Sequence, residues 1–283
     1  MNRSTDISPL SMLLARVDAI SDGSSARDTI ACGFPSVDKV LGGGLRRGDL
    51  TVLGGDVSSG KSALALAVAI RAAQQGARVA FLTAEHTVER VLERVIAIES
   101  RTRIDDLRQG TLNDVARASA GAAALRLRDQ LPFFERLAGG GVDGLAKQMD
   151  TLPAVDLVIV DSVTALLSGA FTLDEELAQA VRALKTLALD REVAILATAP
   201  LPALSERPDR RPTLDDFGAL GSVKQLADVV LGLFRQDMYE AARDIEGATE
   251  LLIRKNRNGP TGYVDLYFYA QWMRFEDMLD PDR

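Results

Sequence analysis

The chain has 283 residues, 47% of them hydrophobic and 26% charged, and its formal net charge is −7. This length and composition fit one large α/β core with a short appendage, and the negative charge argues against a nucleic-acid binder coated in positive charge, although a local basic channel inside an oligomer is compatible with it. The single cysteine, Cys32, and the single histidine, His86, exclude an internal disulfide, a zinc site built on several cysteines and a cluster of histidine ligands.

The N-terminal residues 1–28 are predicted to form an arm that is separate from a main domain at 29–283. No apolar run in the chain is long enough to cross a bilayer, and the first residues do not open a signal peptide, so we expect a cytoplasmic protein with no membrane partner. The arm ends in a turn or linker at 21–25.

An amphipathic helix is predicted inside the arm, after a helix-start signal at Ser8-Pro9. Apolar residues recur there at helical spacing, namely Leu10, Leu13, Leu14, Val17 and Ile20. A lone short helix is marginal in water, so this one must bury its stripe on its own domain or on a neighbouring subunit. The periodicity alone favours its own domain.

A phosphate-binding loop is the strongest signal in the chain. The loop runs from Gly55 to Ser62, reads G-D-V-S-S-G-K-S, and lies between a predicted buried strand at 49–53 and a helix that we expect at 62–75, ended by Gly76. The expected nucleotide-binding residues are Gly55, Asp56, Val57, Ser58, Ser59, Gly60, Lys61 and Ser62. The glycines let successive amides surround a phosphate, Lys61 supplies charge to the β- and γ-phosphates, and Ser62 can ligate Mg²⁺. The loop therefore predicts ATP and Mg²⁺ as ligands.

Two carboxylates follow buried strands further along the chain. Glu85 comes after a predicted strand at 77–83, where it can orient or deprotonate the attacking water; a solvated loop glutamate is the equally weighted alternative. Asp161 ends a continuous apolar strand at 156–161 and can hold the Mg²⁺ shell opposite Ser62. Buried strands often end in aspartate, so Asp161 is informative mainly because it is paired with the phosphate loop.

Strands and helices alternate through the middle of the chain. Helices are predicted at 88–100, at 112–128, up to about Met149 and at 178–189, and a further buried strand is predicted at 193–198. This alternation predicts an α/β fold with a doubly wound, mostly parallel sheet.

The chain changes character beyond Pro200. A charged, proline-punctuated loop at 206–212 reads as solvated, with contact to a polyanion as the alternative. Strand character follows at 225–234, 250–254 and 263–269, with a turn at 256–260, which predicts a hairpin that closes the sheet. Lys255 and Arg257 project from the edge of this hairpin, where such cations can reach the γ-phosphate of a neighbouring subunit in a ring ATPase.

From Gly33 to Met278 the chain resembles the C-terminal, RecA-like motor domain of DnaB-type replicative helicases. The motifs that carry this resemblance are G-F-P-S-V-D-K-V-L, the phosphate loop, F-L-T-A-E-H-T, E-S-R-T-R-I-D-D-L-R-Q-G-T-L, K-N-R-N-G-P-T-G and Q-W-M-R-F-E. The last two are specific to that family, whereas the phosphate loop and L-V-I-V-D-S occur in RecA-like P-loop ATPases generally.

The resemblance implies a homohexameric ring that hydrolyses Mg-ATP and translocates on single-stranded DNA in replication. It also implies Glu85 as the catalytic base, Asp161 as the Walker B carboxylate, and Lys255 with Arg257 acting on the adjacent subunit's nucleotide. Lys61, assigned from the phosphate loop, is likewise expected to act in catalysis. The amphipathic arm looks like the linker helix that packs on a neighbour in those rings. The family's N-terminal domain, which recruits primase, is expected to be absent.

Two departures from the family pattern keep a second function open. Thr198-Ala199-Pro200 stands where the family usually has Ser-Gln-Leu, and Gly218-Ala219-Leu220-Gly221 stands where an Arg-Glu-Ser-Gly stretch forms part of the DNA-binding loop. The loss of these polar side chains weakens DNA contact and its coupling to hydrolysis. The alternative is a RecA-, RadA- or KaiC-like nucleotide-switched ATPase that oligomerises without unwinding DNA.

Overall fold

The computed structural model describes residues 8–23, 28–202, 204, 207–240 and 245–278. The expected linker residues Ser24 and Ser25, the loop residue Glu206 and both ends of the chain lie outside this part. Within it, no helix is long and apolar enough to cross a membrane.

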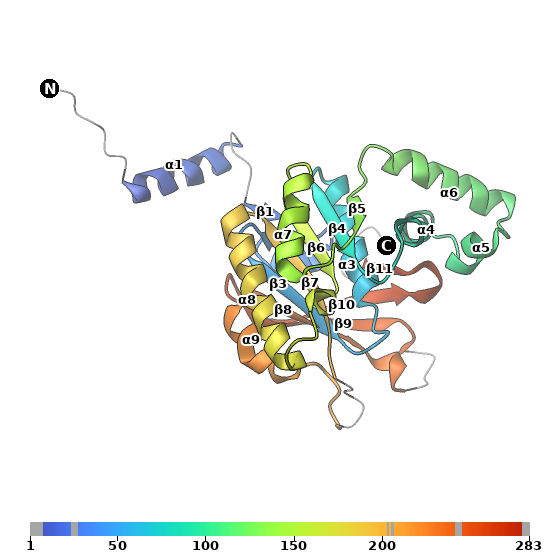
Figure 1. The fold of residues 1–283 in the computed structure, drawn as a ribbon. Coiled ribbons are helices and arrows are strands. Elements are labelled where there is room, and N and C mark those ends of the chain that lie inside the picture. The colour runs from blue at the N-terminus through green and yellow to red at the C-terminus, as the bar shows by residue number, and fades with distance from the viewer. Residues whose placement is uncertain (1–7, 24–27, 203, 205–206, 241–244, 279–283) are drawn as a thin grey trace.

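A nine-stranded sheet in the order β11-β10-β9-β8-β3-β7-β6-β4-β5 forms the centre of the molecule (Figure 1). Strands β8 to β5 of this order are mutually parallel, and β9, β10 and β11 extend the sheet antiparallel beside β8. The strands are β3 (Leu50–Gly55), β4 (Val79–Thr83), β5 (Phe133–Arg136), β6 (Leu157–Asp161), β7 (Ala194–Pro200), β8 (Val229–Arg235), β9 (Ala248–Asn256), β10 (Gly262–Tyr269) and β11 (Arg274–Asp277). The predicted α/β fold, mostly parallel with a C-terminal hairpin, is confirmed.

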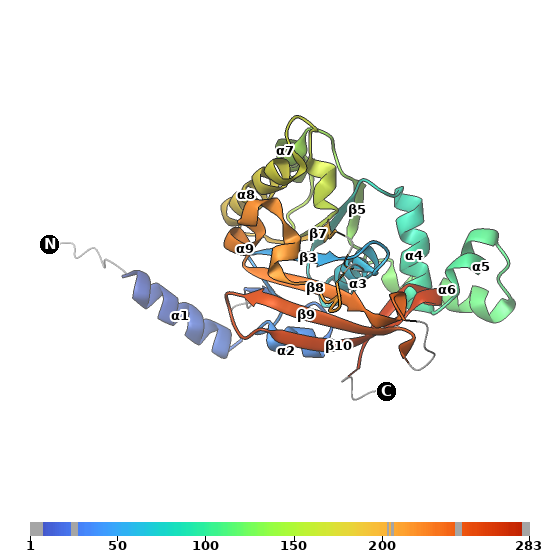
Figure 2. The ribbon, with the colours of Figure 1, turned by 90° about the horizontal axis from the view of Figure 1, so that it is seen from below.

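Helices cover both faces of this sheet. The α-helices are α1 (Pro9–Ser21), α2 (Pro35–Val40), α3 (Lys61–Gln74), α4 (Val88–Ser100), α5 (Ile104–Gln109), α6 (Asp114–Leu127), α7 (Gly141–Thr151), α8 (Leu173–Arg191) and α9 (Ser222–Leu226). One hydrophobic core lies between the sheet and α3 with α4, and a second lies between the sheet and α7 with α8. In Figure 2, α7 and α8 lie to the upper left of β3, β7 and β8, and α3 and α4 lie to the right of these strands.

Short elements join these layers. They are the two-stranded ribbon of β1 (Thr29–Ile30) and β2 (Leu45–Arg46), and the 3₁₀ turns η1 (Val163–Leu166), η3 (Leu214–Phe217), η4 (Ala219–Gly221), η5 (Gln236–Met238) and η7 (Ala270–Trp272). The turns η1, η3 and η4 all lie in the connections that follow β6 and β7, beyond the carboxyl ends of those strands.

Helix α3 is the most deeply buried helix because small and aliphatic residues fill almost all of it. Its run Ala63–Ala73 is buried except for Arg71. Arg71 donates to the backbone oxygens of Gly33 and Phe275 and pairs with Glu276 at 3.0 Å. Its guanidinium also lies 4.0 Å from the ring centre of Phe34. The helix that carries the phosphate loop is thereby fixed to the C-terminal strand β11.

Helix α1 stands away from the rest of the structure in both ribbon views (Figures 1 and 2). As predicted, it begins after Ser8, whose side chain accepts a hydrogen bond from the Leu10 amide. None of its residues is buried, and its apolar stripe is exposed, at Leu10, Met12, Leu13, Leu14 and Val17. The expectation from periodicity, that this stripe packs on its own domain, is therefore wrong for the chain as described.

Candidate functional site

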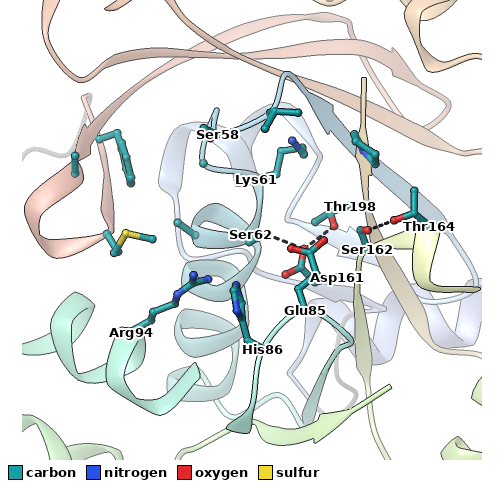
Figure 3. Close-up of a pocket in the computed structure, with 17 residues that line it drawn as sticks. Ser58, Lys61, Ser62, Glu85, His86, Arg94, Asp161, Ser162, Thr164 and Thr198 are labelled. Atoms are coloured by element: carbon teal, nitrogen blue, oxygen red, sulfur yellow. Dashed lines mark hydrogen bonds between the residues drawn. The ribbon is translucent and has the colours of Figure 1, made fainter. Parts of the chain in front are cut away.

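Four parallel strands end at one edge of the sheet, and a pocket of about 500 Å³ opens there. The phosphate loop follows β3, Glu85 follows β4, Asp161 ends β6 and Thr198 lies near the end of β7. The sequence-predicted residues Lys61, Ser62, Glu85 and Asp161 all line this pocket, which Figure 3 shows in close-up. The fold thus brings together residues that are separated by up to a hundred positions in the sequence.

The phosphate loop takes its shape from two glycines. Gly60, at the start of α3, has φ +101°, and a Cβ there would meet the Phe275 ring at 3.0 Å. A Cβ on Gly55 would come within 2.6 Å of the Ser59 hydroxyl and 2.9 Å of the Leu233 carbonyl oxygen. Both positions therefore exclude larger residues, and the loop is held where the amides at the start of α3 can meet an anion.

Lys61 extends over the loop that precedes it. Its ammonium donates to the carbonyl oxygens of Gly55, at 3.0 Å, and Asp56, at 2.8 Å. Burial lowers the pKa of Lys61, while the carboxylates of Asp161, Asp56 and Glu85 act in the opposite direction. The ammonium is thus surrounded by acceptors and negative charge, and phosphate oxygens would be suitable replacements for the two carbonyls.

Asp161 accepts two hydroxyl hydrogen bonds on the same oxygen. Ser62 Oγ lies 3.0 Å and Thr198 Oγ1 lies 2.6 Å from Asp161 Oδ1, which leaves Oδ2 free of these two donors. Asp161 is buried, with 2% of its surface exposed. The predicted pairing of Ser62 with Asp161 is therefore present as a direct contact between the two side chains.

Glu85 leaves the end of β4 with its side chain directed into the pocket beside Asp161 (Figure 3). Its backbone amide donates to Thr83 Oγ1 at 3.2 Å, which fixes the turn at the end of the strand. The residue itself is exposed. A carboxylate that is accessible to water and faces the lysine of a phosphate loop is placed to act as a general base.

The pocket also contains polar residues that were not predicted from the sequence, among them Thr198, His86 and Arg94. Arg94 could have been recognised from the sequence, because it is a charged residue within the buried apolar face of α4 formed by Val91, Val95 and Ile98. The sequence does not identify Thr198 and His86 as pocket residues, since their roles depend on neighbours that the fold brings from other strands.

His86 and Arg94 face the pocket side by side (Figure 3). Burial lowers the pKa of both side chains, and for His86 the nearby Arg94 charge adds to the effect. Within the described residues, the buried His86 Nδ1 and Arg94 Nε atoms have no hydrogen-bond partner, nor does the hydroxyl of Ser59 in the phosphate loop. Unsatisfied buried donors beside a phosphate loop fit a ligand that is rich in acceptor oxygens.

These observations test whether Mg-ATP fits the site. Lys61, Arg94 and Ser59 offer donors to a triphosphate, and Ser62 with Asp161 offers oxygen ligands of the kind that Mg²⁺ prefers. In the part of the chain that the structure describes, no group of three or more His, Cys, Asp or Glu side chains could hold a metal alone. A magnesium ion here would therefore take its remaining ligands from phosphate and water.

Lys255 and Arg257 lie near the amino end of β8, whereas the pocket lies at the carboxyl ends of the parallel strands. Lys255 is paired with Val230, at the beginning of β8, whereas the phosphate loop lies beyond the other end of that strand, where Gly55 pairs with Leu233. The Lys255 ammonium donates to the carbonyl oxygens of Lys224, Gln225 and Ala227. Neither cation is brought to the pocket of its own chain.

Arg257 is anchored to the buried carboxylate of Asp228. Arg257 Nη1 lies 3.2 Å from Asp228 Oδ1, and the same carboxylate accepts from Lys185 at 2.6 Å and from the Leu50 amide at 2.9 Å. The Arg257 side chain is 47% exposed. The Arg257 side chain is therefore accessible at the surface, and its contact with Asp228 fixes it beside the start of β3.

The segment after η3, which departs from the family pattern in sequence, forms a tightly held turn. Ala219 and Leu220 both have positive φ, of +55° and +51°, and the Ala219 amide donates to Asp174 at 2.9 Å. Leu220 is 67% exposed. Where a charged stretch was expected in the family, this chain presents an apolar side chain on a tightly held turn.

The comparisons with known proteins agree with this geometry. The family model for the DnaB-like helicase C-terminal domain matches residues 29–277. The replicative DNA helicase DnaC of Bacillus subtilis is 26% identical over 257 residues, and the replicative DNA helicase DnaB of Buchnera aphidicola is 31% identical over 261 residues. Each alignment covers 88% of this chain and 56% of the relative, so the chain spans little more than half the length of these proteins.

Solved structures share the fold. A DnaB-like replicative helicase, described together with its interactions with primase, superposes with a TM-score of 0.84 at 21% identity, covering 94% of this chain and 66% of the other. A solved ATPase domain gives a TM-score of 0.82 at 23% identity, covering 95% of this chain and 99% of the other. The expected RecA-like fold is confirmed.

Proposed function

This chain belongs to the family of DnaB-like helicase C-terminal domains, and from that premise we propose that it is a Mg²⁺-dependent ATPase motor that translocates on single-stranded DNA as a hexameric ring. The observation that carries the proposal is the convergence of Lys61, Ser62, Glu85 and Asp161 on one pocket at the carboxyl edge of the sheet. Ligands of open α/β sheets bind at this edge.

The pocket residues have distinct roles in the proposed hydrolysis. The loop Gly55–Ser62 binds the phosphates through backbone amides, and the Lys61 ammonium moves from the carbonyls of Gly55 and Asp56 to phosphate oxygens. Glu85 orients a water in line with the γ-phosphate and accepts its proton. Ser62 and Asp161 would hold Mg²⁺, which would supply neutralising charge to the phosphates.

A neighbouring subunit completes the site in this proposal. Lys255 and Arg257 lie at the edge of the sheet opposite to the pocket, so in one chain they stabilise α9 and Asp228 and do not reach the nucleotide. In a ring, the same edge of each subunit can face the pocket of the next, where the two cations stabilise the charge of the transferring phosphoryl group. The exposed stripe of α1 supports the idea that this helix docks on a neighbour.

Contact with single-stranded DNA rests on family membership, because the segment Gly218–Gly221 lacks the arginine and glutamate expected in the DNA-binding loop. Lys224, beside the segment Gly218–Gly221, pairs with Asp215 at 2.8 Å, and Arg207 pairs with Asp216 at 2.7 Å. Each of these two cations therefore already has a carboxylate partner within the chain. Any strand contact here is expected to be weaker than a charged loop would give.

Two assays on the purified chain test the proposal. ATP hydrolysis should require Mg²⁺ and should be lost in Lys61→Ala, because the phosphates lose their buried positive charge. The surface variant Lys39→Ala, on the short helix α2, is the matched control and should hydrolyse ATP like the unmodified chain. ATP hydrolysis that survives Lys61→Ala undiminished would refute the assigned site. Strand displacement on a forked duplex then tests motor activity separately.

A further inference from the structure

An acidic residue occupies the second position of the phosphate loop. Asp56 lies between Gly55, at the end of β3, and Val57, which lines the pocket, yet Asp56 is not itself among the lining residues. Its charge nevertheless acts on Lys61. A carboxylate this close to a triphosphate would repel it, so the direction in which Asp56 points matters for nucleotide affinity.

Two hydrogen bonds fix that direction. Asp56 Oδ1 accepts from the Val57 amide at 2.7 Å, and Asp56 Oδ2 accepts from the phenol of Tyr239 at 2.8 Å. The first bond comes from the adjacent residue and moves with the loop. The second comes from the segment after β8, 183 positions away in the sequence, and is therefore the one that ties the carboxylate to a fixed part of the fold.

Tyr239 is itself held from several sides. Its ring stacks on Phe234 with 5.9 Å between centroids and an angle of 14°, and the guanidinium of Arg210 lies 4.9 Å from its centroid. Its amide donates to Gln236 at 3.0 Å. The preceding turn is braced by the ion pair of Arg235 with Asp237 at 2.8 Å. The phenol thus reaches Asp56 from a preorganised position.

The protonation state of Tyr239 suits the role of a donor. Burial, together with the hydrogen bond to the Asp56 charge, raises the pKa of Tyr239 to about 12. The phenol therefore keeps its proton throughout the range in which enzymes are assayed and donates it to the carboxylate.

We propose that Tyr239 is a positioning residue for nucleotide binding, whose hydroxyl holds the Asp56 carboxylate outside the phosphate pocket. The inference rests on the proposed function, because it assigns a task in the same ATP site. Without the hydroxyl, the carboxylate is free to turn toward Lys61 or the phosphates. A freed Asp56 would compete with ATP for the ammonium and repel the triphosphate, which weakens binding without removing a group that takes part in hydrolysis.

The test is a double-mutant cycle of Tyr239→Phe and Asp56→Asn. Phenylalanine keeps the ring that stacks on Phe234 and removes only the hydroxyl. The dissociation constant of a fluorescent ATP analogue with Mg²⁺, and KM and kcat for ATP, are measured for the unmodified chain, both single variants and the double variant. Thermal unfolding of all four proteins reports on folding.

We expect Tyr239→Phe to raise the dissociation constant and KM by about five- to tenfold, with kcat changed by less than about twofold. In the Asp56→Asn background, which carries no charge to hold, the same substitution should change the dissociation constant by less than about twofold. A purely structural effect of the lost hydroxyl would appear equally in both backgrounds.

Three results would overturn the inference. They are unchanged affinity in Tyr239→Phe, an equal loss in the Asp56→Asn background, and a fall in kcat with unchanged KM. If Tyr239→Phe unfolds, the same cycle with Tyr239→Leu, which also lacks the hydroxyl, decides the matter by the same criteria. Absence of Lys61-dependent ATP binding in the unmodified chain would instead refute the proposed function, and the inference with it.

Discussion

The carboxylate of Glu85 is exposed at the pocket, and its chain neighbour Thr83 fixes the turn that presents it. Glu85→Gln keeps the shape of the side chain but removes its ability to accept a proton. We expect kcat for ATP hydrolysis to fall by on the order of 10²- to 10⁴-fold, while the dissociation constant for ATP stays within about threefold. Steady-state hydrolysis and nucleotide binding measured on the same preparation separate the two effects.

Glu89→Gln is the matched control for this substitution, because Glu89 is also exposed and lies one turn further along, in the first turn of α4. It should leave hydrolysis unchanged. Equal activity of Glu85→Gln and the unmodified chain would remove Glu85 from the mechanism and leave Asp161 as the remaining carboxylate of the pocket.

At the scale of single residues, the sequence was informative where one short motif carries the whole chemistry. Lys61 and Ser62 follow from the phosphate loop, and Asp161 from the strand end that was paired with it. Thr198 could not be predicted, because its hydrogen bond to Asp161 depends on β6 and β7 being neighbours in the sheet. Tyr239 was missed for the same reason, since nothing near it in the sequence points to Asp56.

At the scale of elements, the first turn of α8 holds the connection that follows β6. The Glu176 carboxylate accepts hydrogen bonds from the amides of Ser168, Gly169, Ala170 and Phe171 and from the Ser168 hydroxyl. The amide hydrogen bond from Gly169, together with the hydroxyl hydrogen bond from Ser168, lowers the pKa of Glu176 to about 2. One side chain therefore shapes the whole turn 168–171.

This arrangement predicts a pH dependence of stability. Because the pKa of Glu176 is lower in the folded chain than in the unfolded chain, its contribution is complete above the ordinary glutamate range and is lost as pH falls from about 4.5 toward about 2. Glu176→Gln should therefore be less stable than the unmodified chain at pH 7, and the difference should shrink over that window. Urea unfolding at several pH values measures it.

Glu175→Gln, one position earlier in the same helical turn, tests whether the effect is specific to the turn 168–171. Its carboxylate accepts hydrogen bonds from the amide and the hydroxyl of the cap residue Thr172. It should cost less stability than Glu176→Gln at pH 7. A pH-independent difference between Glu176→Gln and the unmodified chain would contradict the account of the carboxylate as the group that holds this turn.

Several elements were predicted correctly because their patterns are long and regular. The strands at β3, β4, β6 and β7 are continuous apolar runs. The expectation of one strand over 225–234 was wrong at its start, since Gln225 and Leu226 end the short helix α9 and β8 starts only at Val229. The edge strands β5 and β11 were missed, because each has four residues and mixes charged with aromatic side chains.

At the scale of the whole molecule, the pocket and the pair Lys255 and Arg257 lie at opposite edges of the sheet. If hydrolysis needs both, then one chain cannot supply both to the same nucleotide. Lys61→Ala and Arg257→Ala should each be inactive alone, and mixing them should restore hydrolysis at interfaces where an intact pocket meets an intact Arg257. Activity should be greatest at intermediate mixing ratios.

Light scattering of the same mixtures reports whether rings form, and thermal unfolding reports whether loss of the Arg257 contact with Asp228 has damaged the fold. The matched control is Arg254→Ala. Arg254 lies near the end of β9, three positions before Arg257, and its guanidinium donates to the Pro212 carbonyl oxygen. Failure of the mixed proteins to recover hydrolysis, although both fold and assemble, would mean that Arg257 acts only within its own chain.

The most direct test of the central claim is steady-state ATP hydrolysis with and without single-stranded DNA across a salt series. If the chain is a motor on single strands, DNA should stimulate hydrolysis at low salt, and the stimulation should fall as salt rises, because contacts to backbone phosphates weaken. Lys61-dependent hydrolysis that is indifferent to DNA at low salt would contradict a translocating motor and leave an ATPase without a strand to move on.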